Sequence, residues 1–480
     1  MIVEVIVDVS AYPIDRPFDY IVPDKLETVI ERGSRVHVPF GNRKVQGFIT
    51  NIKEKSDLDL SKLKAIISII DVEPVITDEL LQLSKWMTQK TLCYEIDALQ
   101  VMLPAALRAS YKKEIRLVEH DGIDIETLAL FGSKESISYE IFEKAGMLKQ
   151  MKKYLEQGKF QLDTVIKQQG KVKTITKYRM VQDEELVLSQ LNTLPKNAIK
   201  QKELIEWLLL KKQPSYTMLE LKDYTQTNNH TVKALIDKGI LETKNKEIYR
   251  EINSLEYNDR DNRFKLTDEQ QEALSKINNA QDNNEHTTFL LHGITGSGKT
   301  EIYLNAIEKS INEGKQAIML VPEISLTPQM TRRFKLRFDD QVAVMHSGLS
   351  VGEKFDEWRK IWRGEVKVVV GARSAIFAPF KNLGLIILDE EHESTYKQED
   401  TPRYHARDVA IWRSNFHQCP VILGSATPSL ESYARASKGV YSLLTLQMRA
   451  KEQPLPVVNI VDMRAELKNG NRSMFSVDLA

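Results

Sequence analysis

The sequence predicts three successive folding units: a small β-barrel or sandwich, a mixed region of helices and strands, and an α/β lobe with a parallel sheet. Three observations predict this order. Short strand-like runs and turns alternate up to about residue 75, helical periodicity precedes strand-like runs between 199 and 250, and apolar runs alternate with helices after Leu266. A chain of 480 residues is long enough for three or four such units.

The composition is that of an ordinary globular protein, with 42% hydrophobic and 28% charged residues. The 67 basic and 67 acidic residues cancel, so any affinity for nucleic acid has to come from local basic surfaces. The two cysteines, Cys93 and Cys419, predict neither a disulfide framework nor a zinc site. No apolar run approaches the roughly 18 residues of a membrane helix, so we expect a cytoplasmic protein without a membrane partner.

The first unit, residues 1–107, is predicted from four strand-like runs with turn residues at Pro39–Asn42 between two of them. Thr77–Lys90 has helical periodicity, and we expect this helix to plug the barrel. The four runs are Val3–Val7, Phe18–Val22, Arg35–Val38 and Val45–Ile49.

The second unit, residues 108–252, contains two predicted helices, Ile199–Leu210 and Thr231–Lys238. Gly239–Thr243 and Glu247–Arg250 follow and indicate a short hairpin, so the order favours a winged-helix domain. A generic α+β linker domain stays open as the alternative. The polar residues around 258–262 indicate a linker over 253–265.

The third unit, residues 266–450, has short apolar runs between helical segments, which is typical of a parallel sheet covered on both faces. Residues 451–480 are expected to begin a further lobe or to form a disordered tail. The apolar runs are Phe289–Leu291, Ala317–Val321, Val342–Met345, Val366–Val370, Leu385–Leu388 and Val421–Leu423.

A phosphate-binding loop, or P-loop, is the most specific motif. Gly293–Thr300 has the pattern G-x-x-x-x-G-K-T, between a predicted strand and a predicted helix. Its glycines let backbone N–H groups point at phosphate oxygens, Lys299 reaches the β- and γ-phosphates, and Thr300 ligates Mg²⁺. A plain glycine turn is the alternative. The predicted ATP-binding residues of the loop are Gly293, Thr295, Gly296, Ser297, Gly298, Lys299 and Thr300.

Two acidic residues complete the predicted catalytic set with Lys299. The run Leu385–Leu388 ends in Asp389 and Glu390, and ligands of parallel sheets sit at the carboxyl ends of strands. Asp389 is therefore expected to hold Mg²⁺, directly or through water, and Glu390 to orient or deprotonate an attacking water. A solvated acidic turn is the alternative.

Gln270 has two interpretations. Thr267 and Gln270 have the spacing of a capping box at the start of a helix. The Gln270 amide also matches the N6/N7 pair of adenine, which makes it a candidate ATP-binding residue, and Gln271 could compete for that role.

Loops after other strands of the third unit suit a nucleic-acid strand. Small hydroxylic residues follow three apolar runs, in 321–329, 370–375 and 424–429. The loop 394–407 interleaves aromatic and basic residues, which predicts base stacking with phosphate neutralisation, although a plain charged loop is the alternative. The candidate DNA-binding residues here are Arg373, Tyr396, Lys397, Arg403 and Tyr404.

Together these segments resemble superfamily 2 helicases with a RecA-like lobe. Five strings are similar to the PriA, or primosomal protein N′, family of replication-restart helicases. They are LVPEISLTPQ, GARSAIFAPF, LDEEHESTYKQ, YHARDVA and GSATPSLES. At the front, RPFDYIVP and RVHVPFGNRKVQGFI resemble the domain of that family that binds DNA 3′ ends.

The resemblance implies an ATP- and Mg²⁺-dependent 3′–5′ motor that binds stalled forks, D-loops and single strands with a free 3′ end. It implies primosome assembly with single-stranded DNA-binding protein and helicase-loader proteins, in the nucleoid of a bacterial cytoplasm. His392, Ser425 and Thr427 match positions that couple nucleotide to DNA in such motors.

The resemblance also implies a pocket for the DNA 3′ end, lined by Phe18, Asp19, Gly41 and Lys64, with Tyr20 as a further DNA-binding candidate. Asp19 can accept a hydrogen bond from a terminal hydroxyl and repel a phosphate, Phe18 can pack on sugar or base, and Lys64 can neutralise a phosphate. For Phe18 and Tyr20 the alternative is a place in the core.

The resembling family continues into a zinc-bound module and a second motor lobe that supplies an arginine to the γ-phosphate, and the sequence ends at Ala480 before either. Zinc is expected only in that further part. Such an arginine contributes roughly 10³–10⁵ in rate, so we expect this chain to bind DNA and ATP but to hydrolyse ATP poorly. Another fork-repair translocase and a non-enzymatic fork-recognition module are the alternatives.

Overall fold

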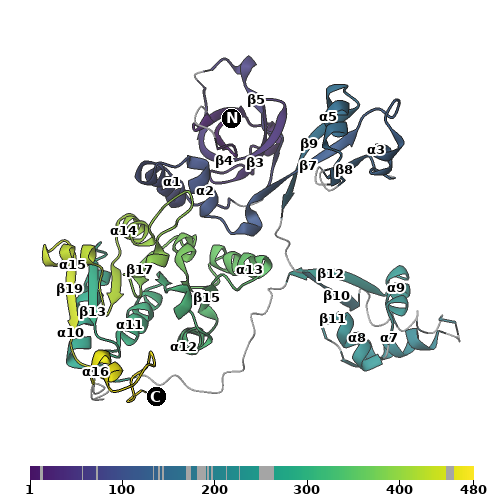
Figure 1. Ribbon diagram of the computed structural model, residues 1–480. Coiled ribbons are helices and arrows are strands. Elements are labelled where there is room, and N and C mark those ends of the chain that lie inside the picture. The colour runs from purple at the N-terminus through teal and green to yellow at the C-terminus, as the bar shows by residue number, and fades with distance from the viewer. Residues whose placement is uncertain are drawn as a thin grey trace.

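The computed structural model shows a β domain and an α/β lobe joined by packed helices, with two smaller units set apart from them (Figure 1). Among the described residues no helix is long and apolar enough to cross a membrane. The structure describes residues 1–10, 14–56, 58–71, 74–132, 134–138, 141–142, 145–168, 174–180, 187, 191, 194–195, 198–211, 213–225, 227–247, 264–449 and 459–479.

The β domain contains a sheet with the strand order β5-β2-β1-β4-β3-β6. Its four longer strands overlap the four predicted runs, and valine and isoleucine side chains from them form a core of their own. Closure of this sheet into a barrel stays a prediction. The strands are β1 (Ile2–Val7), β2 (Phe18–Ile21), β3 (Arg35–Phe40), β4 (Arg43–Lys53), β5 (Lys64–Ala65) and β6 (Ser68–Ile69).

Helices α1 (Asp78–Thr91) and α2 (Glu95–Val101) follow, and the 3₁₀ turn η4 (Ala105–Leu107) ends the segment. Leucines of α1 and α2 share one buried cluster with β1 and β4 and with the α/β lobe. The expectation that α1 plugs a barrel is therefore wrong: the helix has apolar partners on both sides and lies between the β domain and the lobe (Figure 1).

The second unit consists of two small sheets. One has the order β8-β7-β9 and the other β11-β10-β12. The first comprises β7 (Ala109–Leu117), β8 (Ser136–Ser138) and β9 (Phe160–Gln168) with α3 (Ile125–Ala129) and α5 (Leu148–Glu156). The second comprises β10 (Thr174–Met180), β11 (Tyr216–Thr217) and β12 (Leu241–Glu247) with α7 (Ile199–Lys211), α8 (Met218–Thr225) and α9 (Asn229–Asp237).

Helices α7 and α9 lie where the sequence predicts them, but the predicted hairpin is wrong. Residues 241–247 form the single strand β12, which pairs antiparallel with β10, from Leu241 opposite Met180 to Glu247 opposite Thr174. The strand can include Lys244 and Lys246 because their charged side chains are exposed to solvent. The remaining residues of the expected second strand, 248–250, and most of the linker lie outside the described residues.

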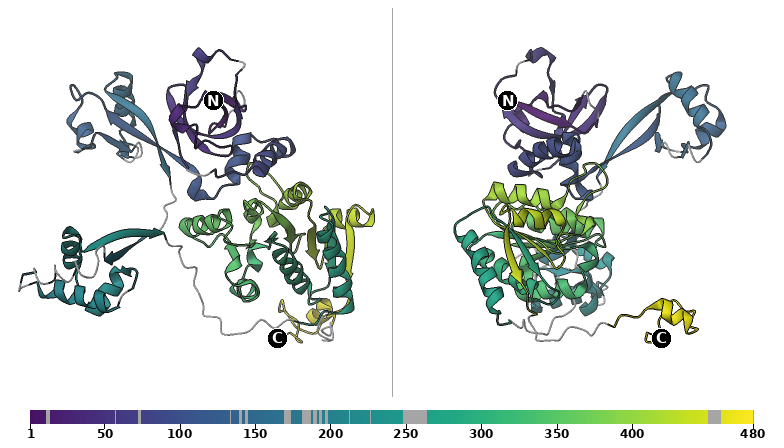
Figure 2. Two further views of the ribbon diagram at one scale, coloured as in Figure 1. Left: turned by 180° about the vertical axis from the view of Figure 1, so that it is seen from behind. Right: turned by 60° about the vertical axis from the view of Figure 1, so that its left-hand side comes forward.

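The α/β lobe is built on a parallel sheet with the order β15-β16-β14-β17-β18-β13-β19, and helices cover both faces (Figure 2). The sequence predicts the first six strands but misses the edge strand β19. The strands are β13 (Thr288–Gly293), β14 (Gln316–Leu320), β15 (Val342–Met345), β16 (Val368–Gly371), β17 (Leu383–Leu388), β18 (Val421–Ser425) and β19 (Ser442–Leu446).

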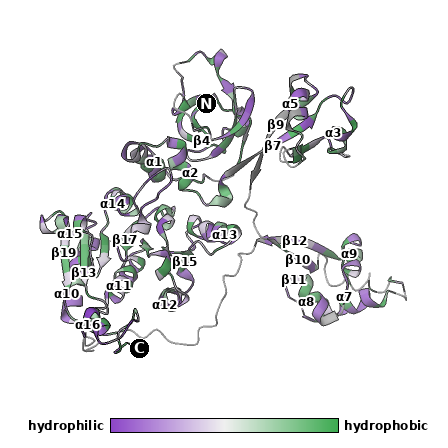
Figure 3. Ribbon diagram, viewed as in Figure 1, coloured by the Kyte–Doolittle hydropathy of each residue, from purple (hydrophilic) through white to green (hydrophobic). Residues whose placement is uncertain are grey.

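Alternate side chains of the central strands enter two different cores, one on each face of the sheet. One core is shared with α10, α11 and α12, and the other with α13, α14 and the α1–α2 segment. Apolar residues accordingly concentrate inside the lobe (Figure 3). The helices are α10 (Asp268–Asp282), α11 (Lys299–Asn312), α12 (Pro328–Phe338), α13 (Val351–Trp362), α14 (Ala406–His417), α15 (Leu430–Ser437) and, near the C-terminus, α16 (Met463–Lys468).

Candidate functional site

The P-loop connects β13 to α11 at the carboxyl edge of the lobe sheet. Gly296 and Gly298 both have φ of +83°, which favours glycine. At Gly293 an added Cβ would lie 2.6 Å from Ser297 Oγ, so only glycine leaves room for the turn. Helix α11 begins at Lys299, and its N-terminal N–H groups favour an anion here.

The polar groups inside this loop fit a phosphate group. Lys299 is 9% exposed, and its Nζ donates to the Gly293 carbonyl over 2.8 Å. Ser297 Oγ is buried and has no hydrogen-bond partner among the described residues. A buried cation and an unsatisfied hydroxyl on a glycine loop form a donor set that suits phosphate oxygens.

Asp389 stands at the end of β17, close enough to Lys299 for their charges to interact. Burial and the neighbouring Glu390 raise the pKa of Asp389, while the Tyr303 hydroxyl and Lys299 oppose the rise. Tyr303 donates to Asp389 Oδ1 over 3.0 Å. Gly424 allows this contact, because a Cβ there would lie 1.7 Å from the Tyr303 oxygen.

The three predicted coupling residues come together beside Glu390. His392 Nδ1 lies 2.8 Å from Ser425 Oγ, and its Nε2 lies 3.5 Å from Thr427 Oγ1. Glu390 has a φ of +46° and places a carboxylate oxygen 3.6 Å from His392 Nδ1. These contacts link the end of β17 to the end of β18, on the edge of the sheet that carries the P-loop.

Glu391 anchors a neighbouring loop, although no motif of the sequence indicates this. It is 1% exposed and accepts hydrogen bonds from the Ser429 N–H over 2.7 Å and from Ser432 Oγ over 2.8 Å. Arg407 approaches the same carboxylate at 3.3 Å. Glu391 therefore anchors the loop after β18 and the start of α15, and its place in an acidic run gave no signal of this structural role.

Gln270 forms the capping box: its side chain accepts from the Thr267 N–H, and Thr267 Oγ1 accepts from the Gln270 N–H. Its amide nitrogen donates to the Ser297 carbonyl over 2.7 Å, and the residue is 3% exposed. Both ends of the amide are thus engaged within the protein, and Gln270 ties α10 to the P-loop. A contact of Gln270 with adenine stays a prediction.

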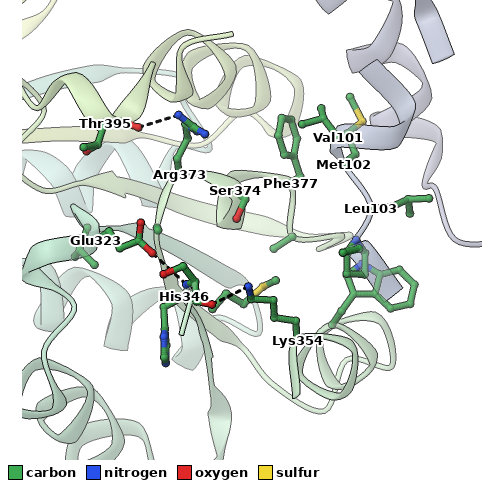
Figure 4. Close-up of a pocket in the computed structure, with 18 of the residues that line it drawn as sticks. Val101, Met102, Leu103, Glu323, His346, Lys354, Arg373, Ser374, Phe377 and Thr395 are labelled. Carbon is green, nitrogen blue, oxygen red and sulfur yellow. Dashed lines mark hydrogen bonds between the residues drawn. The ribbon is translucent and has the colours of Figure 1, made fainter. Parts of the chain in front are cut away.

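A cavity of about 590 Å³ opens between the lobe and the segment after α2. Met102 and Leu103 form part of one wall, and loops that follow β14, β15 and β16 form the other (Figure 4). Arg373 projects along it and donates to the carbonyls of Thr395 and Lys397, over 3.2 and 2.6 Å. Arg373 and Lys397 both line this cavity.

The prediction that Tyr396 and Tyr404 stack on bases is wrong for this conformation. Their exposed fractions are 1% and 2%, because both rings fill apolar space in the lobe core. Tyr396 donates to the Asp389 carbonyl over 2.6 Å, and Tyr404 packs on Phe377 with ring centroids 4.9 Å apart. Lys397 Nζ donates to the Arg403 carbonyl over 2.6 Å, and this hydrogen bond joins the two ends of the 397–403 segment.

The β domain brings Asp19, Gly41 and Lys64 to neighbouring strands and turns. Lys64 lies opposite Tyr20 in the β2–β5 pair, and its Nζ donates to the Gly41 carbonyl over 3.2 Å. Asp19 lies 3.0 Å from Lys53 Nζ and also accepts from Ser56. Lys53 and Ser56, which no motif of the sequence indicates, hold the Asp19 carboxylate in place.

Phe18 is partly buried and packs edge-on against Phe40, with ring centroids 5.3 Å apart. Tyr20 is 4% exposed and belongs to the core, and its hydroxyl donates to the Pro39 carbonyl over 3.3 Å. Burial raises the pKa of Tyr20 to about 12. The prediction that Tyr20 contacts DNA is therefore corrected in favour of the core alternative.

A buried ion pair, which no motif of the sequence indicates, joins the two domains. Arg413 of α14 makes two hydrogen bonds to the Glu79 carboxylate of α1, of 2.5 and 2.8 Å, and donates to the Ile376 and Ala378 carbonyls. His417 Nε2 lies 3.1 Å from the same carboxylate. Glu79 thereby fixes α1 to the segment around η7 (Arg373–Phe377), which carries Arg373.

Two family models match this chain, each over one of the two domains. The 3′DNA-binding domain of PriA matches residues 4–104, and the DEAD/DEAH box helicase family matches residues 267–436. The fold and the site thus define a class of protein in which a 3′DNA-binding domain is joined to a helicase domain.

Comparison with curated proteins leads to the family. The chain is 50% identical over 99% of its length to the replication restart protein PriA of Bacillus subtilis, and 35% identical over 96% to that of Synechocystis. It spans 59% and 56% of the lengths of these relatives. The chain belongs to the PriA replication restart family.

Among solved structures, RecG bound to a three-way DNA junction is similar to 40% of this chain. That match covers 25% of the RecG chain, with a TM-score of 0.31 and 28% identity.

Proposed function

We propose that this chain is the part of a replication-restart DNA helicase that recognises a free DNA 3′ end and binds ATP. The observation that carries the proposal is the buried Glu79–Arg413 pair, because it joins a candidate 3′-end pocket and a P-loop lobe into one packed body. A fork-repair translocase of another kind is disfavoured, because the PriA 3′DNA-binding domain matches residues 4–104.

The residues of the lobe suit ATP as substrate. The P-loop N–H groups and Lys299 hold the phosphate chain, and Ser297 Oγ gains the acceptor that it lacks. Glu390, at the edge of the sheet beside His392, orients or deprotonates the attacking water. His392, Ser425 and Thr427 carry the change in this site to the loop after β18, which is the proposed coupling path.

Thr300 and Asp389 would hold Mg²⁺, and the ion would neutralise charge on the phosphate oxygens when bound. Asp389 suits this role because burial and the neighbouring Glu390 raise its pKa, and a bound cation would offset the cost of its negative charge. Among the described residues no group of three or more His, Cys, Asp or Glu side chains is placed to hold a metal ion.

The β domain suits a terminal 3′-hydroxyl. Asp19 is held by Lys53 and Ser56 and can accept one further hydrogen bond, while its charge disfavours a terminal phosphate. Lys64, exposed next to Gly41, neutralises a backbone phosphate, and Phe18 packs against sugar or base.

A single strand can continue from that domain along the 590 Å³ cavity, where Arg373 and Lys397 stand on the lobe side. We further propose ATP-driven 3′–5′ movement and binding of stalled forks and D-loops. Single-stranded DNA-binding protein and helicase-loader proteins are proposed as partners in primosome assembly in a bacterial cytoplasm. Weak ATP hydrolysis by this chain alone remains a prediction.

Replacing the P-loop lysine separates the two sites. Lys299→Ala should reduce ATP affinity by at least about tenfold, because a charge-assisted contact to phosphate is lost. It should leave binding to a fork with a free 3′ end unchanged. Both are measured by titration, with exposed Lys276→Ala as the matched control. ATP binding by Lys299→Ala at the unaltered affinity would overturn the assignment of the nucleotide site.

A further inference from the structure

A second cation lies beside the P-loop, in a segment beyond the part that the helicase family model matches. Strand β19 runs parallel to β13 and places Leu446 opposite Gly293. The chain then passes the loop, so that Arg449 Cγ and Cδ lie 4.0 Å from the position of a Cβ on Gly296. The Arg449 side chain therefore packs directly on the middle of the phosphate-binding turn.

The backbone that leads to Arg449 is held on both sides. Glu269 Oε2 accepts hydrogen bonds from the N–H groups of Gln447 and Met448, over 2.9 and 3.2 Å. The Ile294 N–H donates to the Leu446 carbonyl over 3.4 Å. The segment is thus tied to the first turn of α10 and to the P-loop itself, which fixes the place of Arg449 relative to the loop.

In the described part of the chain, no acidic side chain forms an ion pair with the Arg449 guanidinium. Its Nε is buried without a hydrogen-bond partner there, and the nearby Glu269 carboxylate is used by backbone N–H groups. A guanidinium stays protonated at all relevant pH values, and a buried donor without an acceptor is costly. An anion placed in the P-loop would supply that acceptor.

We propose that Arg449 is a ligand of the nucleotide phosphates, in addition to Lys299. The inference rests on the proposed function, because it takes the P-loop as the ATP site. The planar fork of a guanidinium matches the oxygens of a phosphate group and gives a stronger contact than a neutral donor. A residue from the chain segment after β19 thereby senses whether the loop is filled.

The test compares ligands with and without phosphate. Arg449→Gln should weaken binding of ATP and of pyrophosphate by about tenfold, through loss of a charge-assisted contact, and leave adenosine binding unchanged. Arg449→Lys should lose less, since it keeps the charge. Arg472→Gln, which makes the same change at an exposed position, is the control. Equal melting temperatures of Arg449→Gln and the unaltered chain without ligand exclude a folding defect.

Unchanged ATP and pyrophosphate affinities in Arg449→Gln would overturn the proposal. An equal loss of adenosine, ATP and pyrophosphate binding would also overturn it, because the contact would then not be specific to phosphate. If the unaltered chain bound neither ATP nor pyrophosphate, the nucleotide site itself would fall, together with the inference. If the unaltered chain binds ATP and Arg449→Gln binds it equally well, only the proposed role of Arg449 fails and the nucleotide site stands.

Discussion

At the residue scale, burial decides which of the predicted functional side chains belong to a site and which belong to the core. Lys299, Asp389 and His392 lie together at one edge of the sheet, as the spacing of their motifs predicts. Tyr20, Tyr396 and Tyr404 look equally suited to DNA but are core residues. Residue type identifies what a side chain can do, whereas its exposure depends on elements distant in the sequence.

Glu79 is the residue on which the junction of the two domains depends. Burial by itself would raise the pKa of Glu79, but Arg413 and His417 outweigh it and hold the pKa at about 2, compared with 4.5 for a free glutamate. A carboxyl with a lowered pKa stabilises the fold above its unfolded pKa, and the contribution is lost as the pH falls toward the folded pKa.

We expect Glu79→Gln to destabilise the chain by about 3–5 kcal/mol at pH 7, because it breaks a buried ion pair. The difference from the unaltered chain should shrink as the pH falls from about 4.5 toward 2. Urea unfolding followed by tryptophan fluorescence measures this, since Trp86 and Trp412 face each other across the junction with ring centroids 6.2 Å apart. Asp78→Asn, which removes an exposed pair with Arg32, is the control, and a loss of equal size there would contradict the assignment.

At the element scale, prediction from the sequence works where one pattern defines one element. Six strands of the lobe are apolar runs, and their parallel direction follows from the helices between them. Strand β19 alternates buried and exposed residues at the edge of the sheet, so its run is too mixed to predict. The predicted hairpin at 239–250 is wrong because the partner of β12 is the distant strand β10.

The start of α10 shows how one element positions another. Gln270 serves both as the N3 residue of the capping box and as the donor to the Ser297 carbonyl in the P-loop. Two substitutions separate these roles. Thr267→Ala and Gln270→Ala should each cost about 1 kcal/mol of stability through the cap, measured by thermal unfolding.

Only Gln270→Ala should also weaken ATP binding, because the P-loop loses a hydrogen bond at Ser297. Titration with ATP compares the two variants directly. Equal ATP affinities for Thr267→Ala and Gln270→Ala would show that the link from α10 to the P-loop has no role in nucleotide binding.

At the scale of the whole molecule, α1 and α2 lie between the β domain and the lobe (Figure 1), and a shared apolar core joins the two. The sequence indicates each domain by its own motifs, but it does not indicate the packing of α1 on α14, because a single ion pair and a few apolar contacts carry no local pattern. The packing joins the candidate 3′-end residues around Asp19 and the cavity beside Arg373 in one packed body.

The most direct test of this arrangement is the affinity of the chain for a fork with a 3′-hydroxyl, compared with the same fork carrying a 3′-phosphate. We expect the unaltered chain and the exposed control Asp24→Asn to bind the hydroxyl form more tightly, because the Asp19 charge repels a terminal phosphate. Asp19→Asn should remove most of that preference while keeping Lys299-dependent ATP binding. Equal affinity of the unaltered chain for the two forks would contradict the recognition of a free 3′ end.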